Sequence, residues 1–558
     1  MRTWGLSSLL SILFIGTILF LPADNESSEP SLSAFWISSY PEPTALFDYE
    51  LQPFYHGVAA GDPLQDGFII WTRVTPDTVG PVDVYWEVSI KDDFTVLAAT
   101  GSFATDASRD YTVKVDVKGL QAGRQYAYRF RANNRWSLTG YARTLPDKQP
   151  DQIKLAIATC ANYEGGYYNA YERIAEQELD AVVHLGDYIY EYGTGHYGQE
   201  ELLENGRKHL PETEIYSLAD YRQRYSQYRT DSMLRKAHQQ HAFIPIWDDH
   251  ETANDSYQGG AENHQIEEEG DWELRKQHAQ QAYFEWMPIR EQEGGHIYRA
   301  FDFGGMVHLM MVDTRIVGRS QQVANSQAED YRDTARTLLG KPQADWLTTQ
   351  MQKPTHWRVI GNQVMVSPMD ISFMRFMGMR IPWYSGRTRN MDQWDGYPAA
   401  RNRVFDIIEN QQLSNVVFLT GDDHASYGYE VVREENFERY GLDTTIRPLA
   451  VELVTPSISS ANFDEYLPDF LLRKFKRAYP RHNPHLKWFD LTRHGYIFLN
   501  CTPQQIDVEW RYVPTITEPA KGLQPPVKWV IPSGNARLLP RDEDAAAFTL
   551  AMDGAEEV

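Results

Sequence analysis

Several apolar segments of the chain end on side chains that can bind a metal ion. The side chains at these ends belong to Cys160, to Asp187 and Tyr190, to Asp249 and His250, to Asn362, and to Asp422 and His424. Aspartate, asparagine and histidine bind hard or borderline cations, and cysteine and tyrosine in the same set suit trivalent iron. Because ligands of open α/β sheets bind at the carboxyl ends of the strands, we expect these ends to converge on one cleft.

Two cations in such a cleft can cleave a phosphate ester. A carboxylate between two cations can bridge them, and Asp187 is the natural candidate. Cations about 3.5–4 Å apart can bind both the attacking and the departing oxygen of the ester. A water molecule on a strong Lewis acid has a pKa near ~7, so the resulting hydroxide can attack the phosphorus.

Each motif alone has a simpler interpretation. Gly186-Asp187 is typical of a turn, Asp249-His250-Glu251 of a helix N-terminus, Gly421-Asp422-Asp423-His424 of a turn with a surface histidine, Cys160 of an inert buried thiol, and Asn362 of a capping residue. The metal site is favoured because all of these ends occur in one domain, in one order, each after a buried-type strand.

Two further residues are candidates for contact with the substrate. His250 can protonate the leaving oxygen or donate a hydrogen bond to the transition state, and the alternative is a structural histidine paired with a carboxylate. Arg315 can hold a non-bridging phosphate oxygen with its planar fork. The alternative for Arg315 is a structural ion pair with Asp313 or another acid.

The segments that carry these residues have the pattern of an α/β domain. From Ile153 onward, short apolar runs alternate with helix-like segments such as 169–178, which predicts buried strands covered by helices. We assign residues 150–515 to this catalytic domain. Residues 516–534 are rich in Pro and Gly and the last residues are acidic, so 516–558 is interpreted as a linker and a loosely ordered tail.

An all-β region precedes the α/β domain. Apolar residues alternate with polar ones over 84–90, 111–117 and 126–130, which predicts antiparallel strands with one buried face. The segment from Leu120 to Tyr126 is typical of the tyrosine corner of a fibronectin-like sandwich. We therefore expect a small structural β-sandwich over about 45–148.

The N-terminus predicts export. Arg2 precedes an apolar run from Leu9 to Leu21, and residues 1–23 are interpreted as a signal peptide, with an uncleaved anchor as the alternative. We expect a secreted or periplasmic protein without a stable membrane span once the signal is removed. The two cysteines, Cys160 and Cys501, allow one disulfide in principle.

Charge limits the partners. The formal net charge is -24, from 53 Lys and Arg against 77 Asp and Glu. Binding a nucleic-acid backbone requires a basic surface, so we exclude nucleic acid as a partner. One basic segment, 470–482, carries Arg473, Lys474, Lys476, Arg477 and Arg481. It can be a lid over an anionic site, a membrane contact or a solvated helix face.

The chain contains six motifs that are recognisable as a set, namely His-Leu-Gly-Asp187-Tyr-Ile-Tyr190-Glu-Tyr, Trp-Asp-Asp249-His250-Glu, Asp-Thr-Arg315, Gly-Asn-Gln363-Val-Met, Trp394-Asp-Gly-Tyr-Pro398 and Gly-Asp422-Asp-His424-Ala-Ser. Together they resemble the motifs of the PhoD-like alkaline phosphatases and phosphodiesterases, members of the metallophosphoesterase superfamily. Gly57-Val-Ala-Ala-Gly-Asp62-Pro and Ile70-Trp-Thr-Arg73 resemble the N-terminal β-domain of that family. The resemblance runs from about residue 50 to about residue 512. Asp423 departs from it, since small or apolar residues are more usual there.

The resemblance implies a fold, a cofactor set and an activity. The fold is a four-layer αββα sandwich related to the purple acid phosphatases, and the cofactors are iron(III) (Fe3+) with one or two calcium ions (Ca2+). The iron ligands would be Cys160, Asp187, Tyr190 and His424, and the second metal would take Asp187, Asp249 and Asp422, with Asn362 as a further ligand.

The leading hypothesis is therefore a secreted, metal-dependent hydrolase of phosphomonoesters or phosphodiesters. The runner-up is a phospholipase-like diesterase that acts on lipid headgroups. Two hypotheses of a different class are a non-catalytic, calcium-binding extracellular protein and an iron oxidoreductase. The ligand series that includes Cys160 and Tyr190 argues against a simple calcium scaffold.

Overall fold

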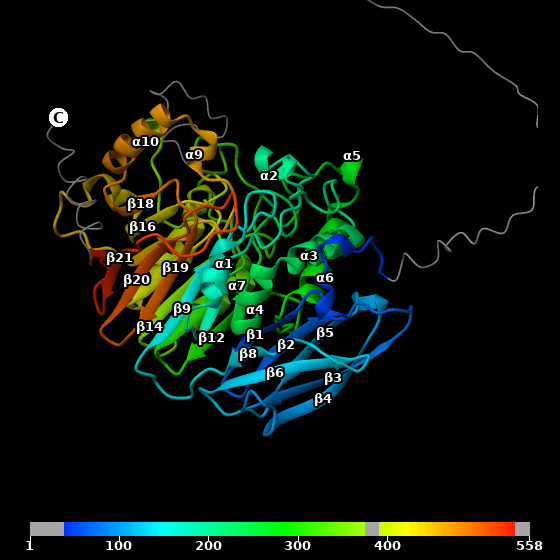
Figure 1. Cartoon of the computed structure of the whole chain (residues 1–558). Helices are drawn as coiled ribbons and strands as arrows, with labels where there is room; N and C mark the ends of the chain where they lie inside the picture. Colours follow the sequence, from blue (N-terminus) through cyan, green and yellow to red (C-terminus); the bar gives the residue numbers. More distant parts are fainter. Residues whose placement is uncertain (1–37, 374–389, 542–558) are drawn as a thin grey trace, which may run out of the picture. The chain divides into compact units, whose positions relative to one another are not determined.

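Two stacked β-sheets form the centre of the molecule (Figure 1). The computed structural model describes residues 38–373 and 390–541. The first sheet has ten strands in the order β22-β21-β20-β19-β9-β10-β11-β1-β2-β5. Their bounds are β1 Val58–Leu64, β2 Gly67–Arg73, β5 Thr112–Val117, β9 Ile153–Ala158, β10 Ala181–His184, β11 Ala242–Pro245, β19 Gly495–Cys501, β20 Gln505–Tyr512, β21 Val527–Pro532 and β22 Leu539–Pro540.

The second sheet has seven strands in the order β12-β13-β14-β15-β17-β16-β18. Their bounds are β12 Arg299–Phe303, β13 Val307–Met311, β14 Trp357–Asn362, β15 Val416–Thr420, β16 Ser426–Val431, β17 Ala450–Val454 and β18 Leu486–Asp490. Within each sheet the central strands run parallel, namely β9, β10 and β11 in the first and β13, β14, β15 and β17 in the second. This parallel arrangement brings the carboxyl ends of the central strands of each sheet to one edge.

Alternation along the strands explains the layers. In β15, Val417 and Leu419 face the core between the two sheets, whereas Val416 and Phe418 face a second core under helices. That second core contains residues of α7 (Gly340–Met351) and α8 (Pro398–Asn410). Helices α1 (Asn169–Ala175), α3 (Leu218–Thr230), α4 (Ser232–Gln240) and α6 (Trp272–Trp286) contribute to the large core on the side of the ten-stranded sheet. The predicted four-layer αββα architecture is confirmed.

The N-terminal β-sandwich shares a sheet with the rest of the chain. Strands β1, β2 and β5 form one edge of the ten-stranded sheet, and Ala60 of β1 pairs in parallel with Ala242 of β11. A smaller sheet packs on them, with strands β3 (Val82–Ser89), β4 (Leu97–Thr105), β6 (Gln125–Ala132), β7 (Arg135–Trp136) and β8 (Gly140–Arg143). The Tyr126 hydroxyl accepts a hydrogen bond from the Gln121 backbone N–H at 2.8 Å, as a tyrosine corner does. The domain boundary near residue 148 stays a prediction.

Part of the expected linker is strand. Val527, Trp529 and Ile531 alternate along β21 with their side chains buried, and β21 pairs with β20. The range 516–558 therefore extends the ten-stranded sheet as far as β22, because period-two alternation outweighs the flanking Pro and Gly residues. Residues 542–558 and the expected signal at 1–23 lie outside the described residues.

Four short or peripheral helices complete the described structure. They are α2 (Glu200–Glu204), α5 (Ile266–Glu269), α9 (Phe463–Tyr466) and α10 (Asp469–His482). Among the helices of residues 38–373 and 390–541, none has the length and apolar composition needed to cross a bilayer. Cys160 and Cys501 are both buried free thiols, so the disulfide considered from the sequence is not formed.

Candidate metal centre

The five predicted strand ends are real strand ends. Strands β9, β10 and β11 are followed by Cys160, Asp187 and Asp249, while β14 ends at Asn362 and Asp422 follows β15. Four residues in the loops that follow these strands have a positive φ, which is 57° at Cys160, 56° at Asp187, 67° at Asp422 and 68° at His424. Non-glycine residues rarely adopt this left-handed region, and such strain concentrates at functional sites.

Gly186 allows the turn at Asp187. Its φ is 105°, and a Cβ there would lie 2.3 Å from the backbone nitrogen of Asp248. The loops after β10 and β11 therefore approach each other more closely than any other residue permits. Glu251 ties the same two loops, because its carboxylate accepts from the backbone N–H groups of Asp187 and Asp248 at 3.0 and 2.8 Å.

All four predicted iron ligands meet in one place. The Cys160 Sγ lies 3.4 Å from Asp187 Oδ2, and the Tyr190 hydroxyl lies 3.1 Å from the same oxygen. Tyr190 is also 3.2 Å from His424 Nε2. The His424 Nδ1 lies 2.8 Å from the carbonyl oxygen of Ala461, so Nδ1–H donates and Nε2 faces the cluster as an acceptor. Burial lowers the pKa of His424 to about 4, which keeps this imidazole neutral as a metal ligand requires.

A second set of ligands overlaps the first. Ligand atoms of Cys160, Asp187 and His424 lie within 4.8 Å of one another, and so do those of Asp187, Asp249 and His250. Asp187 belongs to both groups, which is the position that a bridging carboxylate occupies. A third group consists of Asp248, Asp249 and Asp422.

The electrostatics of this cluster call for a cation. Burial, and then the charges of Asp249, Glu251 and Asp422, raise the pKa of Asp187 well above its usual range, although His250 opposes them. Burial also raises the pKa of the Cys160 thiol, and Asp187 adds to the effect. One oxygen of Asp187, Oδ1, is buried and accepts no hydrogen bond from the described part of the chain. A buried carboxylate without a partner is costly, so these oxygen, nitrogen and sulfur donors fit the metals implied by the sequence.

His250 is held by a carboxylate that the sequence analysis missed. Its Nδ1 lies 2.7 Å from Glu191 Oε2, and the Tyr190 ring stacks on the imidazole at 4.2 Å between centroids. Burial alone would lower the pKa of His250, but Glu191, Asp187 and Asp249 outweigh it and raise that pKa well above its ordinary value. Burial opposes the ionisation of Glu191, yet His250 lowers the Glu191 pKa to about 2. The only signal in the sequence was the position of Glu191 directly after Tyr190.

Arg315 lies within the acidic cluster instead of at its mouth. The guanidinium is fully buried, and its nitrogens donate to the carboxylates of Asp248, Asp392 and Asp422. Each of its nitrogens therefore has an acceptor in the protein, which favours the structural ion-pair role over contact with phosphate. Asp313, the partner considered from the sequence, instead accepts from the Arg315 backbone N–H at 2.8 Å. Asp392 had no sequence signal, because it comes from a separate loop.

The side-chain amide of Asn362 makes hydrogen bonds with both its oxygen and its nitrogen. Its Oδ1 accepts from the Trp394 indole N–H at 2.9 Å, and its Nδ2 donates to the Val364 carbonyl at 2.7 Å and to the Thr420 hydroxyl at 3.0 Å. These contacts satisfy the amide and fix the loop after β14. The contacts therefore favour a supporting role for Asn362 over a role as a metal ligand.

A cavity of about 260 Å³ opens beside His424. It is lined by Asp423, His424, Ala461, Asn462, Phe463, Tyr466 and Leu467. Tyr197 links this rim to the cluster, because its hydroxyl lies 3.3 Å from His424 Nδ1 and its ring stacks on Tyr466 at 6.2 Å. Residues of α9 therefore form part of the wall of the cavity that His424 lines.

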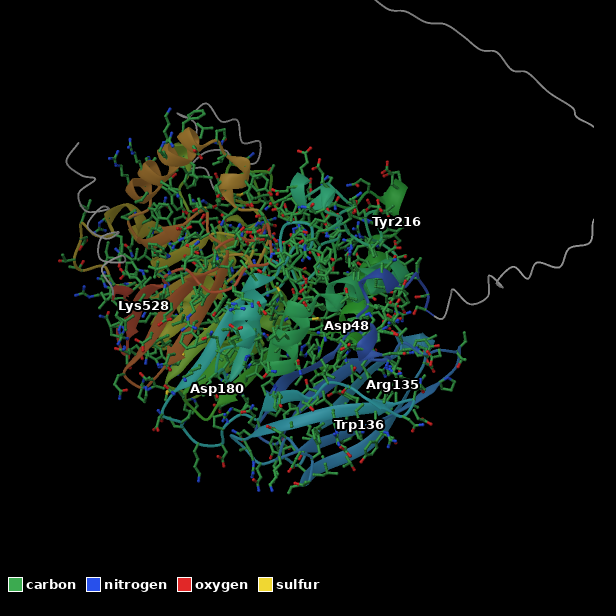
Figure 2. All side chains as sticks on the ribbon, in the orientation of Figure 1. Asp48, Arg135, Trp136, Asp180, Tyr216 and Lys528 are labelled. Carbon is green, nitrogen blue, oxygen red and sulfur yellow. The ribbon has the colours of Figure 1, made fainter. Side chains whose placement is uncertain are left out.

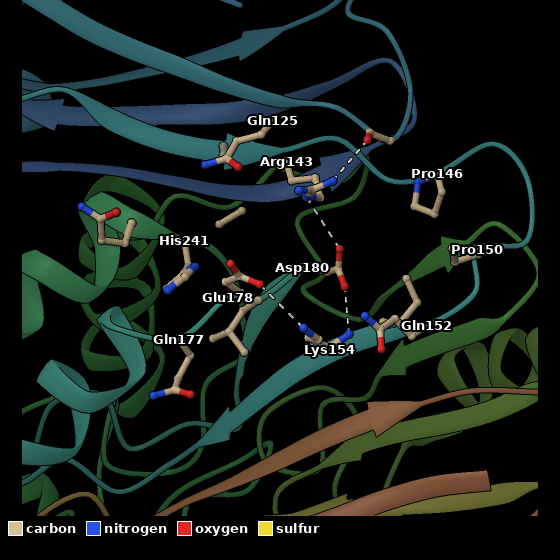
Figure 3. Close-up of a pocket in the computed structure, with 16 residues that line it drawn as sticks. Gln125, Arg143, Pro146, Pro150, Gln152, Lys154, Gln177, Glu178, Asp180 and His241 are labelled. Carbon is tan, nitrogen blue, oxygen red and sulfur yellow. Dashed lines mark hydrogen bonds and ion pairs between the residues drawn. The ribbon is translucent and has the colours of Figure 1, made fainter. Parts of the chain in front are cut away.

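A second cavity, of about 510 Å³, lies at the opposite ends of the same strands (Figure 3). Its lining includes Asp180, just before β10, and Ala242, the first residue of β11. Figure 2, in the orientation of Figure 1, labels Asp180 well away from the place where Figure 1 labels α9 and α10. The charges there face one another, with Arg143 at 3.7 Å from Asp180 and Lys154 at 3.8 Å from Glu178. Within the described residues, no group of three clustered metal-binding side chains lines this cavity, so it is separate from the metal centre.

Comparison with known proteins identifies relatives that cover most of the chain. The model of the PhoD-like phosphatase matches residues 155–510, and that of the PhoD-like phosphatase N-terminal domain matches residues 43–146. Alkaline phosphatase D of Bacillus subtilis (strain 168) is 35% identical over 520 residues, which are 88% of this chain and 82% of that protein. A solved structure of PhoD superposes with a TM-score of 0.77 at 31% sequence identity, and the match covers 90% of this chain and 97% of that one.

Proposed function

The chain belongs to the PhoD-like phosphatase family and is a phosphoester hydrolase, and from this premise we propose that it cleaves phosphate esters at the metal centre around Asp187. The observation that carries the proposal is the position of Asp187, whose carboxylate lies within 4.8 Å of ligand atoms of Cys160 and His424 and also of Asp249. Family membership also sets aside the hypotheses of a non-catalytic protein and of an oxidoreductase.

We assign the ligands by their chemistry. Cys160, Asp187, Tyr190 and His424 combine thiolate, carboxylate, phenolate and imidazole, which suits iron(III). Asp249 and Asp422 offer oxygen donors, which suit calcium, with Asp187 between the two metals. When bound, such cations neutralise the charge of the ester and activate a water molecule near neutral pH.

The protein's own side chains then position and supply a proton. Glu191 holds Nδ1 of His250 and keeps the imidazole protonated. The other nitrogen, Nε2, makes no hydrogen bond to a described residue, so it is free to donate to the leaving oxygen. The buried guanidinium of Arg315 balances the charges of Asp248 and Asp422. Tyr190 and Tyr197 shield His250 from water by stacking.

The substrate we propose is a small phosphate ester that reaches His424 through the cavity lined by α9. A phospholipase-like action on lipid headgroups is the second candidate, and the exposed basic helix α10 near that cavity favours it. We also propose that residues 1–23 direct secretion, which N-terminal sequencing of the exported protein would check.

The test compares bis(p-nitrophenyl) phosphate with p-nitrophenyl phosphate at alkaline pH. The wild type is assayed with calcium and with a chelator, next to Asp187→Ala and to Asp180→Ala, an acid of the separate cavity. We expect activity that chelation and Asp187→Ala abolish and Asp180→Ala retains, and the ratio of the two rates separates diesterase from monoesterase. Metal analysis of the wild type should find iron and calcium. Equal loss in both variants, or activity that chelation leaves intact, would refute the metal proposal.

A further inference from the structure

The solvent-exposed face of α10 is positively charged, whereas the protein as a whole is strongly acidic. This helix carries Arg473, Lys474, Lys476, Arg477 and Arg481, all exposed, against one acid, Asp469. None of these cations lies within 4.0 Å of a carboxylate among the described residues, although the chain has 77 Asp and Glu against 53 Lys and Arg. In so acidic a protein, unpaired cations gathered on one helix point to an anionic partner.

The helix is anchored, so its basic face has a fixed direction. Leu472, Phe475 and Tyr479 are buried and pack in a core with strands β16 and β18. Residues 473, 477 and 481 follow one another at intervals of four, which places them on one stripe of the helix. Residue 470 begins the same stripe. The buried residues lie on the other side, so the stripe faces solvent.

Two large aromatic side chains accompany the cations. Phe470 at the start of α10 is 55% exposed and Tyr466 at the end of α9 is 56% exposed. Large apolar groups that stay exposed next to basic ones are typical of helices that lie in a membrane interface, where the ring enters the headgroup layer. A soluble polyanion would contact the cations but would bury none of the apolar surface of Phe470.

This surface adjoins the cavity beside His424, one of the proposed metal ligands. Tyr466 lines the cavity beside His424, and its ring stacks on that of Tyr197. Figure 1 shows α9 and α10 together at the periphery of the described structure. We propose that α10, with Phe470 and Tyr466, docks the protein on an anionic lipid surface with the cavity beside His424 turned toward the lipid headgroups. The proposal concerns where the protein binds, and it requires no particular ester as substrate.

Vesicle binding tests the proposal without any catalysis. The described residues belong to one compact unit, so the protein from residue 24 onward is used, which removes the apolar N-terminal run. Cosedimentation is measured with phosphatidylcholine vesicles and with vesicles that also contain phosphatidylglycerol. The variant R473E/K474E/R477E is compared with K91E/K148E/K521E, which makes the same change in net charge at exposed lysines elsewhere.

We expect the wild type to prefer the anionic vesicles and to lose this preference at high salt. Each cation near an anionic membrane contributes about fivefold in affinity, so the α10 variant should bind roughly 100-fold more weakly. The control variant should keep most of the binding. Phe470→Ser in the otherwise wild-type protein should bind the anionic vesicles more weakly than the wild type does. Should R473E/K474E/R477E melt at a lower temperature than the wild type, the neutral pair R477Q/R481Q replaces it.

Three results would overturn the proposal. The first is equal binding of the wild type to neutral and anionic vesicles. The second is equal loss in the α10 variant and the control variant, because the effect would then come from net charge. The third is binding to soluble polyphosphate but not to vesicles, with no effect of Phe470→Ser, which would assign α10 to a polymeric anion.

Discussion

Replacing Glu191 by Gln isolates what the carboxylate does for His250. The substitution keeps the shape and can keep the contacts to the Asn254 backbone and the Asn263 amide, at 2.7 and 2.9 Å. It removes the charge 2.7 Å from His250 Nδ1. An opposite charge at this range shifts a pKa by about 1–3 units, so we expect the His250 pKa to fall by that amount.

The sign of the effect on activity follows from the role of His250 as proton donor. The protonated form is lost as the pH rises through the pKa of His250, and that pKa is raised in the wild type. In Glu191→Gln the alkaline limb of kcat should therefore move down by about 1–3 pH units, with a loss of roughly 10- to 1000-fold above it. Near pH 6 the loss should be smaller, because more of the imidazole is still protonated.

The assay compares p-nitrophenyl phosphate with phenyl phosphate across the pH range. Proton donation matters more for the more basic phenolate, so the loss should be larger on the phenyl ester. Glu214→Gln is the matched control, because Glu214 accepts from the same Asn263 at 3.1 Å but the structure gives it no contact with His250. Superimposable pH profiles of Glu191→Gln and the wild type, or equal losses on the two esters, would refute the role of His250 as proton donor.

Three further predictions concern metal and stability. In urea unfolding, a chelator should lower the unfolding free energy of the wild type by about 2.7 kcal/mol, relative to the protein with metal at 100 times its Kd. The same comparison for Asp422→Asn should give a smaller decrease. Burial lowers the pKa of His184 to about 3, so between pH 6.5 and 3 the unfolded state binds a proton that the folded state does not. From pH 7 to pH 5 the wild type should then lose about 2 kcal/mol more than His184→Gln, and equal losses would contradict this. Asn362→Ala should cost about 1–3 kcal/mol, because it leaves the Trp394 N–H without its acceptor, yet keep the metal content by elemental analysis; loss of metal would make Asn362 a ligand.

The sequence was sufficient for the strand ends because both of their signals are local. A short apolar run ending in Asp187 or Asp422 indicates a buried strand and a polar residue at its carboxyl end, without knowledge of the partner strand. The same local alternation predicted the strands of the β-sandwich and the corner at Tyr126. The family resemblance then ordered these ends, and the fold confirms it.

The remaining features depend on contacts between distant segments. Arg315 pairs with Asp248, Asp392 and Asp422, which are 67, 77 and 107 residues away, and no local pattern indicates which acids will surround a buried guanidinium. The parallel pairing of Ala60 with Ala242 likewise joins the sandwich to the main sheet across the sequence. Composition misled in one place, since the Pro and Gly residues around β21 concealed its alternating Val527, Trp529 and Ile531.

The strain and the charge of the site have a common explanation in the fold around it. Four proposed ligands have left-handed backbone, and each such residue costs of order 1–3 kcal/mol. Together with the buried oxygens Asp187 Oδ1 and Asp248 Oδ2, which accept no hydrogen bond from a described residue, this cost is comparable to the whole stability of a typical domain, about 5–15 kcal/mol. Such an arrangement persists only where strands from two sheets and the Glu251 contacts hold the loops in place. The fold therefore keeps the donors close together before any metal binds, and the cations, once bound, would offset the negative charge.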